Sequence, residues 1–169
     1  ISVTFKNWFS ELSLHNQDKI HPVINALKKK GFCYTKDAAL WFKSSDLGDE
    51  KDRVLIKKDG NFTYFAVDIA YHDQKIIRGY KHLINIWGAD HHGYLPRVSA
   101  AMEALGKNQD MLEVVFIQFA NLLRNGEKVS MSTRGGEFIT LMELIEEVSS
   151  EAARFFYINR KADQHLDFD

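Results

Sequence analysis

An acid and two adjacent histidines, Asp90, His91 and His92, directly follow an apolar run in the segment LINIWGADHHGYLP. A transition-metal site usually needs three or four ligands, and ligand pairs on a helix stand four residues apart. Because adjacent side chains point in different directions in helices and strands, only one of these histidines could readily join Asp90. No cysteine cluster and no third spaced histidine stands nearby in the sequence. We therefore expect no metal here, and either a structural or a ligand-facing role for the histidines.

Gly88 stands between the apolar run and this polar group, and a glycine lets the backbone approach a ligand closely. If the run is a strand of a parallel sheet, the residues after it open onto the carboxyl edge, where such sheets bind ligands. There Asp90 would meet a cationic or hydroxyl group, and His91 or His92 a ribose or a phosphate.

A second polar set has helical spacing: Tyr64 and Asp68 are four residues apart, and Tyr71 or His72 follows, so that they would share one face of a helix or its entry. A carboxylate can accept two parallel hydrogen bonds from a planar guanidinium, and an aromatic neighbour can supply a ring face or a hydroxyl. On spacing alone, an amphipathic helix with half-buried tyrosines is the simpler interpretation.

The elements that would position these residues alternate from about residue 61 onward. Three apolar runs, TYFAV, HLINIW and EVVFIQFANLL, are separated by segments of helical spacing. We expect TYFAV to be a short extended segment with a helix after it through about Gly79. The next helix should run from about Tyr94 to Leu105, where Gly106 ends it. Strands that alternate with helices predict an α/β fold with parallel βαβ units covered by helices.

Two other parts flank this alternation. Before it, Ile20, Val23, Ile24 and Leu27 predict a helix, and FCYTKDAALWFKSS and DRVLIKKDG predict short strands of a small mixed subdomain. After it, the polar loop RNGEKVSMSTRGGE leads to a helix that begins with a Thr140–Glu143 capping box. A second helix from about Ser150 should bury Ala152, Phe155 and Phe156. We expect domains at residues 1–60, 61–125 and 126–169.

Composition limits the classes of function. The formal net charge is −1, so no global basic field would attract nucleic acid, and an RNA contact would have to be local. The lysines at 28–30 are most simply favourable charges at a helix C-terminus. The longest apolar run is too short and too polar to span a bilayer. A single cysteine, Cys33, and no visible signal sequence favour a cytoplasmic protein without a membrane contact.

The segment IWGADHHGY, with GDEKDRVL and TYFAVDIAYH before it and EKVSMSTR and AARFFYINRKADQHLDFD after it, resembles bacterial-type arginyl-tRNA synthetases. These are class I aminoacyl-tRNA synthetases, and the resemblance runs over essentially the whole chain. It implies the second half of a class I, Rossmann-like nucleotide-binding domain with a parallel sheet. An inserted mixed α+β subdomain (1–60) would precede this half, and the signature loop with its supporting helices (126–169) would follow it.

The resemblance also implies an activity: ATP-dependent activation of arginine to arginyl-adenylate and its transfer to tRNA(Arg). Mg²⁺ would accompany ATP, bound mainly by the phosphates. The arginine pocket of the family falls on Tyr64 and Asp68, with Asp90 as a further candidate. Gly88, His91 and His92 would border adenosine.

The flexible signature loop of the family, of the form K-M-S-K-S, falls on residues 130–134, so Met131 would contact ATP and Ser132 would serve catalysis. Uncharged Ser130 and Thr133 stand where lysines are customary. Lys128 and Arg134 could therefore meet the leaving pyrophosphate, or a lysine elsewhere in the full enzyme could.

The first class I signature, of the form H-I-G-H, does not occur in this sequence. We therefore expect a fragment of the ligase that is inactive by itself. Two other interpretations fit the same residues: a non-catalytic nucleotide- or RNA-binding module derived from a synthetase, and a metal-dependent hydrolase that uses Asp90, His91 and His92.

Overall fold

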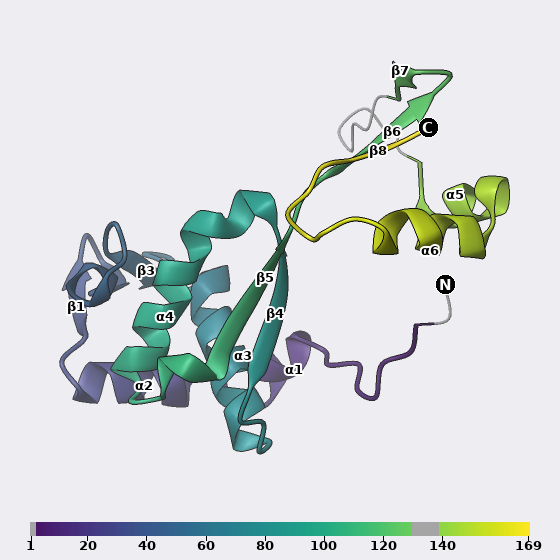
Figure 1. The fold of residues 1–169 in the computed structure, drawn as a ribbon. Coiled ribbons are helices and arrows are strands. Elements are labelled where there is room, and N and C mark those ends of the chain that lie inside the picture. Colours follow the sequence, from purple (N-terminus) through teal and green to yellow (C-terminus); the bar gives the residue numbers. More distant parts are fainter. Residues whose placement is uncertain (1–2, 130–138) are drawn as a thin grey trace. The chain divides into compact units, whose positions relative to one another are not determined.

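The structure is a computed structural model that describes residues 3–129 and 139–169. Contacts between Cα atoms divide the chain into two compact units. Unit 1 comprises Ile1–Lys6, Ile86–Asp90 and Val115–Asp169, and unit 2 comprises Asn7–Asn85 and His91–Val114. Figure 1 shows the order of the elements along the chain.

Unit 2 holds most of the helices. They are α1 (Leu12–Asn16), α2 (Ile20–Lys29), α3 (Tyr64–Ile77) and α4 (Leu95–Ala104). Its strands β1 (Cys33–Lys36), β2 (Ala39–Phe42) and β3 (Arg53–Ile56) form an antiparallel sheet in the order β1-β2-β3. The unit also contains the short 3₁₀ helices η1 (Ser44–Leu47) and η3 (Gln109–Met111). The short strands predicted for the first part of the chain are therefore confirmed.

The core of unit 2 begins with α2, whose four apolar residues Ile20, Val23, Ile24 and Leu27 are buried as their spacing predicted. They pack in one cluster with Phe42 and Leu55 of the sheet and with the buried face of α3. The small sheet and α2 thus pack against α3 in one apolar interior, which holds α3 in place.

The prediction that TYFAV would be extended is wrong, because α3 begins at Tyr64. Thr63 is the N-cap residue: its hydroxyl oxygen accepts a hydrogen bond from the amide of Ala66 and donates one to the carbonyl of Val54. A short apolar run fits a buried strand and a buried helix equally well, and here the cap decides for the helix.

The β–α–β order predicted after α3 is present. Strands β4 (Leu83–Gly88) and β5 (Leu112–Ile117) are hydrogen-bonded neighbours, and α4 lies between them in the chain. The 3₁₀ helix η2 (Ala89–Tyr94) joins β4 to α4. Gly106 follows α4 with a φ of +76°, which explains why the helix ends where the glycine predicted.

Unit 1 ends with a second, smaller set of elements. Strand β6 (Ala120–Arg124) pairs antiparallel with β7 (Glu127–Lys128) and parallel with β8 (Leu166–Phe168). Helices α5 (Leu141–Val148) and α6 (Ser150–Ile158) stand between β7 and β8 in the chain. The predicted capping box at the start of α5 is confirmed, since Thr140 and Glu143 exchange both hydrogen bonds.

The predicted buried face of α6 is wrong in part. Ala153 is the fully buried residue of this helix, whereas Phe155 and Phe156 are exposed by 65% and 42%. The core that they could join is small, with Leu122, Leu144, Leu166 and Phe168 as its buried members. Phe156 contacts Phe168 at its edge, with 4.8 Å between ring centroids, and Phe155 packs against Phe156.

The mixed α/β fold predicted from the alternation is confirmed by these elements. In the part of the chain that the structure describes, no helix has the length and apolar character needed to cross a membrane.

Candidate functional site

Asp68 lies in the second turn of α3 and is half-buried. Its carboxylate oxygen Oδ2 accepts a hydrogen bond of 2.5 Å from the hydroxyl of Tyr94, at the end of η2. Burial raises the pKa of Tyr94 far above its ordinary value, and the hydrogen bond to Asp68 raises it further. The phenol therefore stays protonated and remains a donor to the carboxylate.

Tyr64, one turn before Asp68, contacts the same phenol ring. The rings of Tyr64 and Tyr94 stack with 5.8 Å between centroids and 25° between planes. Tyr64 is 65% exposed, so one side of this stack is open to solvent in unit 2. The predicted neighbours Tyr64 and Asp68 are thus brought together through a residue that the spacing did not reveal.

A guanidinium group supports this stack from within the protein. Arg97 of α4 donates a hydrogen bond of 3.1 Å to the hydroxyl of Tyr64 and lies over the ring of Tyr94, 4.8 Å from its centroid. Its Nε atom is 3.8 Å from a carboxylate oxygen of Asp49. That Nε is buried and has no hydrogen-bond partner among the residues that the structure describes.

Asp49 is the buried anion near this arginine, and the guanidinium that donates hydrogen bonds to it is that of Arg53. Its two oxygens accept hydrogen bonds of 2.7 and 2.8 Å from Arg53 of β3, and its side chain is 1% exposed. Burial alone would raise the pKa of Asp49, but hydrogen bonds from Arg53, Ser44 and the amide of Glu50 hold it below its ordinary value. One buried carboxylate between two guanidinium groups therefore lies behind the two tyrosines.

This arrangement suits a flat cation. Tyr94 occupies Oδ2 of Asp68, and Oδ1 has no hydrogen-bond partner within residues 3–129 and 139–169. A guanidinium could donate to Oδ1 and place its plane beside the exposed ring of Tyr64.

Tyr71 and His72, which share the helical face predicted for Tyr64 and Asp68, have other contacts. Tyr71 stacks on Phe9 with 4.7 Å between ring centroids. His72 is buried, with its Nδ1 2.8 Å from the backbone carbonyl oxygen of Asp68. It therefore reaches the backbone of Asp68 rather than its carboxylate.

The Asp-His-His stretch forms the 3₁₀ helix η2 rather than part of a strand or an α-helix. Asp90, His91 and His92 are exposed, and the ring of His91 meets the ring of Tyr94 edge-on at 6.4 Å. Gly88 and Asp90 belong to unit 1, whereas His91 and His92 belong to unit 2 with Tyr64 and Asp68. His91 thereby joins Tyr64 and Asp68 as a third predicted residue in contact with Tyr94.

Among the described residues, no group of three or more His, Cys, Asp and Glu side chains is placed to hold a metal ion. Lys128 is exposed in β7. The other predicted residues of the signature loop, Met131, Ser132 and Arg134, lie outside the described residues.

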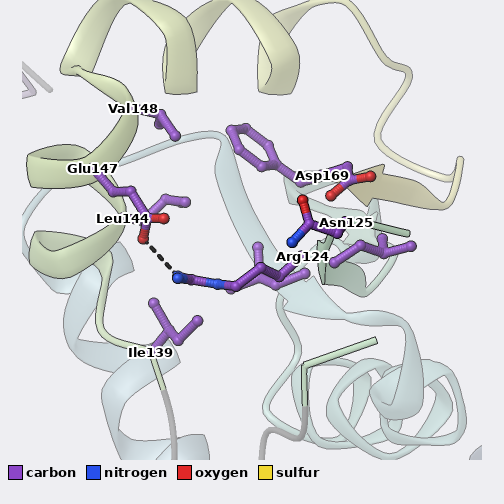
Figure 2. A pocket seen from close by; sticks show the side chains of 10 residues that line it. Arg124, Asn125, Ile139, Leu144, Glu147, Val148 and Asp169 are labelled. Carbon is purple, nitrogen blue, oxygen red and sulfur yellow. Dashed lines mark hydrogen bonds and ion pairs between the residues drawn. The ribbon is translucent and has the colours of Figure 1, made fainter. Parts of the chain in front are cut away.

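A separate cavity of about 360 Å³ lies within unit 1. Its apolar lining includes Leu122, Leu144 and Phe168, and Figure 2 shows Arg124 pointing toward Glu147 beside it, joined by an ion pair of 2.8 Å. None of its lining residues was predicted to belong to a site, because no motif marks them and most of them come together from β6, α5 and β8.

Comparisons with known proteins agree with the resemblance of the motifs. The family described as tRNA synthetases class I (R), catalytic domain, matches residues 4–166. The arginine–tRNA ligase 1 of Halalkalibacterium halodurans is 54% identical over 99% of this chain and 30% of its own length. The arginine–tRNA ligase of Hydrogenovibrio crunogenus is 58% identical over 99% of this chain and 28% of its own length.

A crystal structure from Campylobacter jejuni, provisionally named an arginyl-tRNA synthetase, superposes with a TM-score of 0.89. It is 42% identical, and the match covers 99% of this chain and 36% of that one. The chain thus spans about 30% of the length of the curated relatives that it matches.

Proposed function

Since this chain belongs to the family of class I tRNA synthetases (R), we propose that it serves in an arginine–tRNA ligase. The enzyme would activate arginine with ATP and transfer it to tRNA(Arg). An ordinary cytoplasmic location, as the single Cys33 suggests, belongs to the same proposal.

Arginine would be recognised by Asp68 and Tyr64. The substrate guanidinium would donate to Oδ1 of Asp68, while Tyr94 holds Oδ2 and keeps the carboxylate in one orientation. Tyr64, stacked on Tyr94, would offer its exposed ring to the cation. Asp90 is proposed as a further contact of the amino acid.

ATP would be bound by Gly88, His91, His92 and Met131, with Mg²⁺ held mainly by its phosphates. In the first step, a carboxylate oxygen of arginine attacks the α-phosphorus, a new carbonyl–O–P bond forms, and the bond to pyrophosphate breaks. This displacement needs positioning and positive charge more than a protein acid or base. We assign the charge to Lys128 and Arg134 and a positioning role in the loop to Ser132.

In the second step, a ribose hydroxyl of the terminal adenosine of tRNA(Arg) attacks the carbonyl carbon of arginyl-adenylate. The ester bond forms, AMP leaves with the electron pair of the broken C–O bond, and the hydroxyl proton passes to solvent or to the phosphate.

The observation that carries the proposal is the half-buried carboxylate of Asp68, held by Tyr94 beside the exposed Tyr64. In the full-length enzyme, Asp68→Asn should raise the KM for arginine by about 10- to 100-fold, because a charge-assisted hydrogen bond contributes ~1.5–3 kcal/mol. The KM for ATP should change little.

Asp73→Asn is a matched control, since it removes a carboxylate of the same helix that pairs with Lys107 at 3.0 Å. This variant should leave the KM for arginine within twofold of the wild type. An unchanged arginine KM in Asp68→Asn would rule out the assignment of Asp68.

The 169-residue chain by itself should show no ATP–pyrophosphate exchange with arginine, because it lacks the first class I signature. Robust exchange by the purified chain would refute this expectation.

A further inference from the structure

A chain of buried and half-buried polar side chains connects α3 to β4 behind the Asp68 turn. Asn85 of β4 is buried, and its Nδ2 lies 2.7 Å from Nε2 of His72. The ammonium of Lys75 donates a hydrogen bond of 2.9 Å to Oδ1 of Asn85. Together with the contact between His72 and the Asp68 carbonyl, these groups form a continuous relay, Lys75–Asn85–His72–Asp68.

The chemistry of its two ends fixes the direction of every hydrogen bond in the relay. The Asp68 carbonyl can only accept, so Nδ1 of His72 must carry a hydrogen. The Lys75 ammonium can only donate, so Asn85 presents Oδ1 to Lys75 and Nδ2 to His72. Nε2 of His72 therefore accepts, and the ring is neutral with its hydrogen on Nδ1.

Protonation of His72 would disrupt this order. Burial lowers the pKa of His72, and the positive charge of Lys75 lowers it further. Burial likewise lowers the pKa of Lys75, although Asp68 favours its charged form. Each polar group of the relay is thus satisfied in one arrangement of tautomer and side-chain orientation.

Asp68 is consequently held from two sides. Its carboxylate is fixed by Tyr94, and its backbone carbonyl is tied through His72 to Asn85 of the neighbouring strand. All four residues belong to unit 2. A fully apolar contact could join α3 to β4 with similar stability, so a directional relay at this turn indicates a requirement for position.

We propose that His72 and Asn85 are positioning residues for arginine binding, which fix the α3 turn so that Asp68 meets the substrate guanidinium. This inference rests on the proposed function of Asp68. The two residues do not touch the substrate and act through Asp68.

The test compares Asn85→Leu and His72→Leu with the wild type in the full-length enzyme. Both variants should raise the KM for arginine about fivefold or more, while the KM for ATP changes less than twofold, because a turn misplaced by a fraction of an ångström weakens a hydrogen bond to a charge. His72→Asn keeps a donor near the position of Nδ1 but has no atom in place of Nε2, so it loses the link to Asn85 and should raise the arginine KM as Asn85→Leu does.

A double variant shows whether the effect passes through Asp68. In the Asp68→Asn background, Asn85→Leu should change the arginine KM by less than twofold, since the interaction that it positions is already lost. An equal multiplication of the arginine KM in both backgrounds would overturn the proposal.

Other outcomes are equally decisive. Arginine and ATP KM values that rise alike in Asn85→Leu, or an arginine KM within twofold of the wild type, would also overturn the relay. If Asn85→Leu does not fold, Asn85→Ser, whose hydroxyl is too short to join His72 and Lys75, is judged by the same criteria.

The Asp68→Asn variant separates the two proposals. If it leaves the arginine KM unchanged, the proposed arginine site fails. If it raises the arginine KM and the relay variants do not, the relay alone fails.

Discussion

The hydroxyl of Tyr94 donates a hydrogen bond of 2.5 Å to the carboxylate of Asp68, although 26 residues separate them in the chain. Tyr94 lies at the end of η2 and Asp68 in the second turn of α3, so the contact joins two of the segments that carry predicted site residues. The donor stays protonated, because burial and the nearby carboxylate raise its pKa. Oδ2 of Asp68 is therefore engaged by the protein, and Oδ1 is the oxygen that we propose for the substrate.

Tyr94→Phe removes this hydroxyl and leaves the ring stacked on Tyr64. The carboxylate of Asp68 then loses the donor that fixes its orientation. We expect the KM for arginine to rise by about 3- to 10-fold, which corresponds to ~1 kcal/mol of binding free energy. Steady-state kinetics of the full-length enzyme at varied arginine concentration measures this change.

Tyr34→Phe is the matched control for that substitution. Tyr34 donates a hydrogen bond of 2.9 Å to Asp52, so the same chemical group is removed from another tyrosine–aspartate pair of unit 2. Its arginine KM should stay within about twofold of the wild type. If both variants change the KM equally, the effect belongs to general stability and not to the Asp68 site.

Sequence reasoning succeeded where the signal is local. The capping box of α5 needs Thr140 and Glu143 three residues apart, and the buried stripe of α2 needs helical spacing. Tyr64 and Asp68 do lie on one helix, as their spacing suggests, although the apolar run that contains Tyr64 was wrongly predicted to be extended. Each of these features depends on neighbours within one or two turns.

The features that were not predicted from the sequence depend on contacts between elements that are distant in the chain. Neither Tyr94 nor Arg97 was predicted as part of the site, although LINIWGADHHGYLP contains the first and α4 the second. Their roles arise from partners in α3 and beside η1, and no spacing rule links those segments. The exposed Phe155 is a similar case, since the local pattern marks an apolar face and the size of the core decides what is buried.

Asp49→Asn should destabilise unit 2 strongly. The carboxylate is buried and accepts two hydrogen bonds from Arg53, so its loss leaves a partly buried cation without its partner. Removing one member of such a pair costs about 3 kcal/mol or more. Urea denaturation and hydrogen exchange of the β3 amides measure the change in the free energy of unfolding.

Glu147→Gln removes one member of the exposed Arg124–Glu147 pair and serves as the comparison. Both of its side chains are more than half exposed, so the loss should stay below about 1 kcal/mol. Equal losses in the two variants would contradict the structural role assigned to Asp49.

The relay predicts how stability depends on pH. The pKa of His72 lies below its ordinary value of 6.5 in the folded protein because of burial and Lys75. As the pH falls through 6.5, the unfolded chain therefore takes up a proton that the folded chain refuses. The stabilising contribution is complete above pH 6.5 and is lost progressively below it.

We expect His72→Gln to lose less stability than the wild type when the pH is lowered from about 7.5 to about 5. Thermal unfolding of the two proteins in parallel measures the difference. A wild-type-like pH dependence in His72→Gln would show that this ring does not titrate as the relay requires.

Lys128→Ala tests the source of positive charge for the first chemical step. Lys128 is exposed in β7, directly before the loop in which Ser130 and Thr133 replace the customary lysines. If Lys128 meets the leaving pyrophosphate, its loss removes charge stabilisation that is needed only as the P–O bond breaks. The rate of ATP–pyrophosphate exchange should then fall about tenfold or more, while the KM for arginine stays within about twofold.

Lys161→Ala, another exposed lysine of unit 1, should leave both parameters unchanged. A raised ATP KM with an unchanged rate at saturating ATP in Lys128→Ala would mean that Lys128 binds the ground state of ATP. A wild-type rate would leave Arg134 as the remaining candidate among the two basic residues beside the signature loop. The ratio of the two kinetic effects therefore separates a transition-state role of Lys128 from simple nucleotide binding.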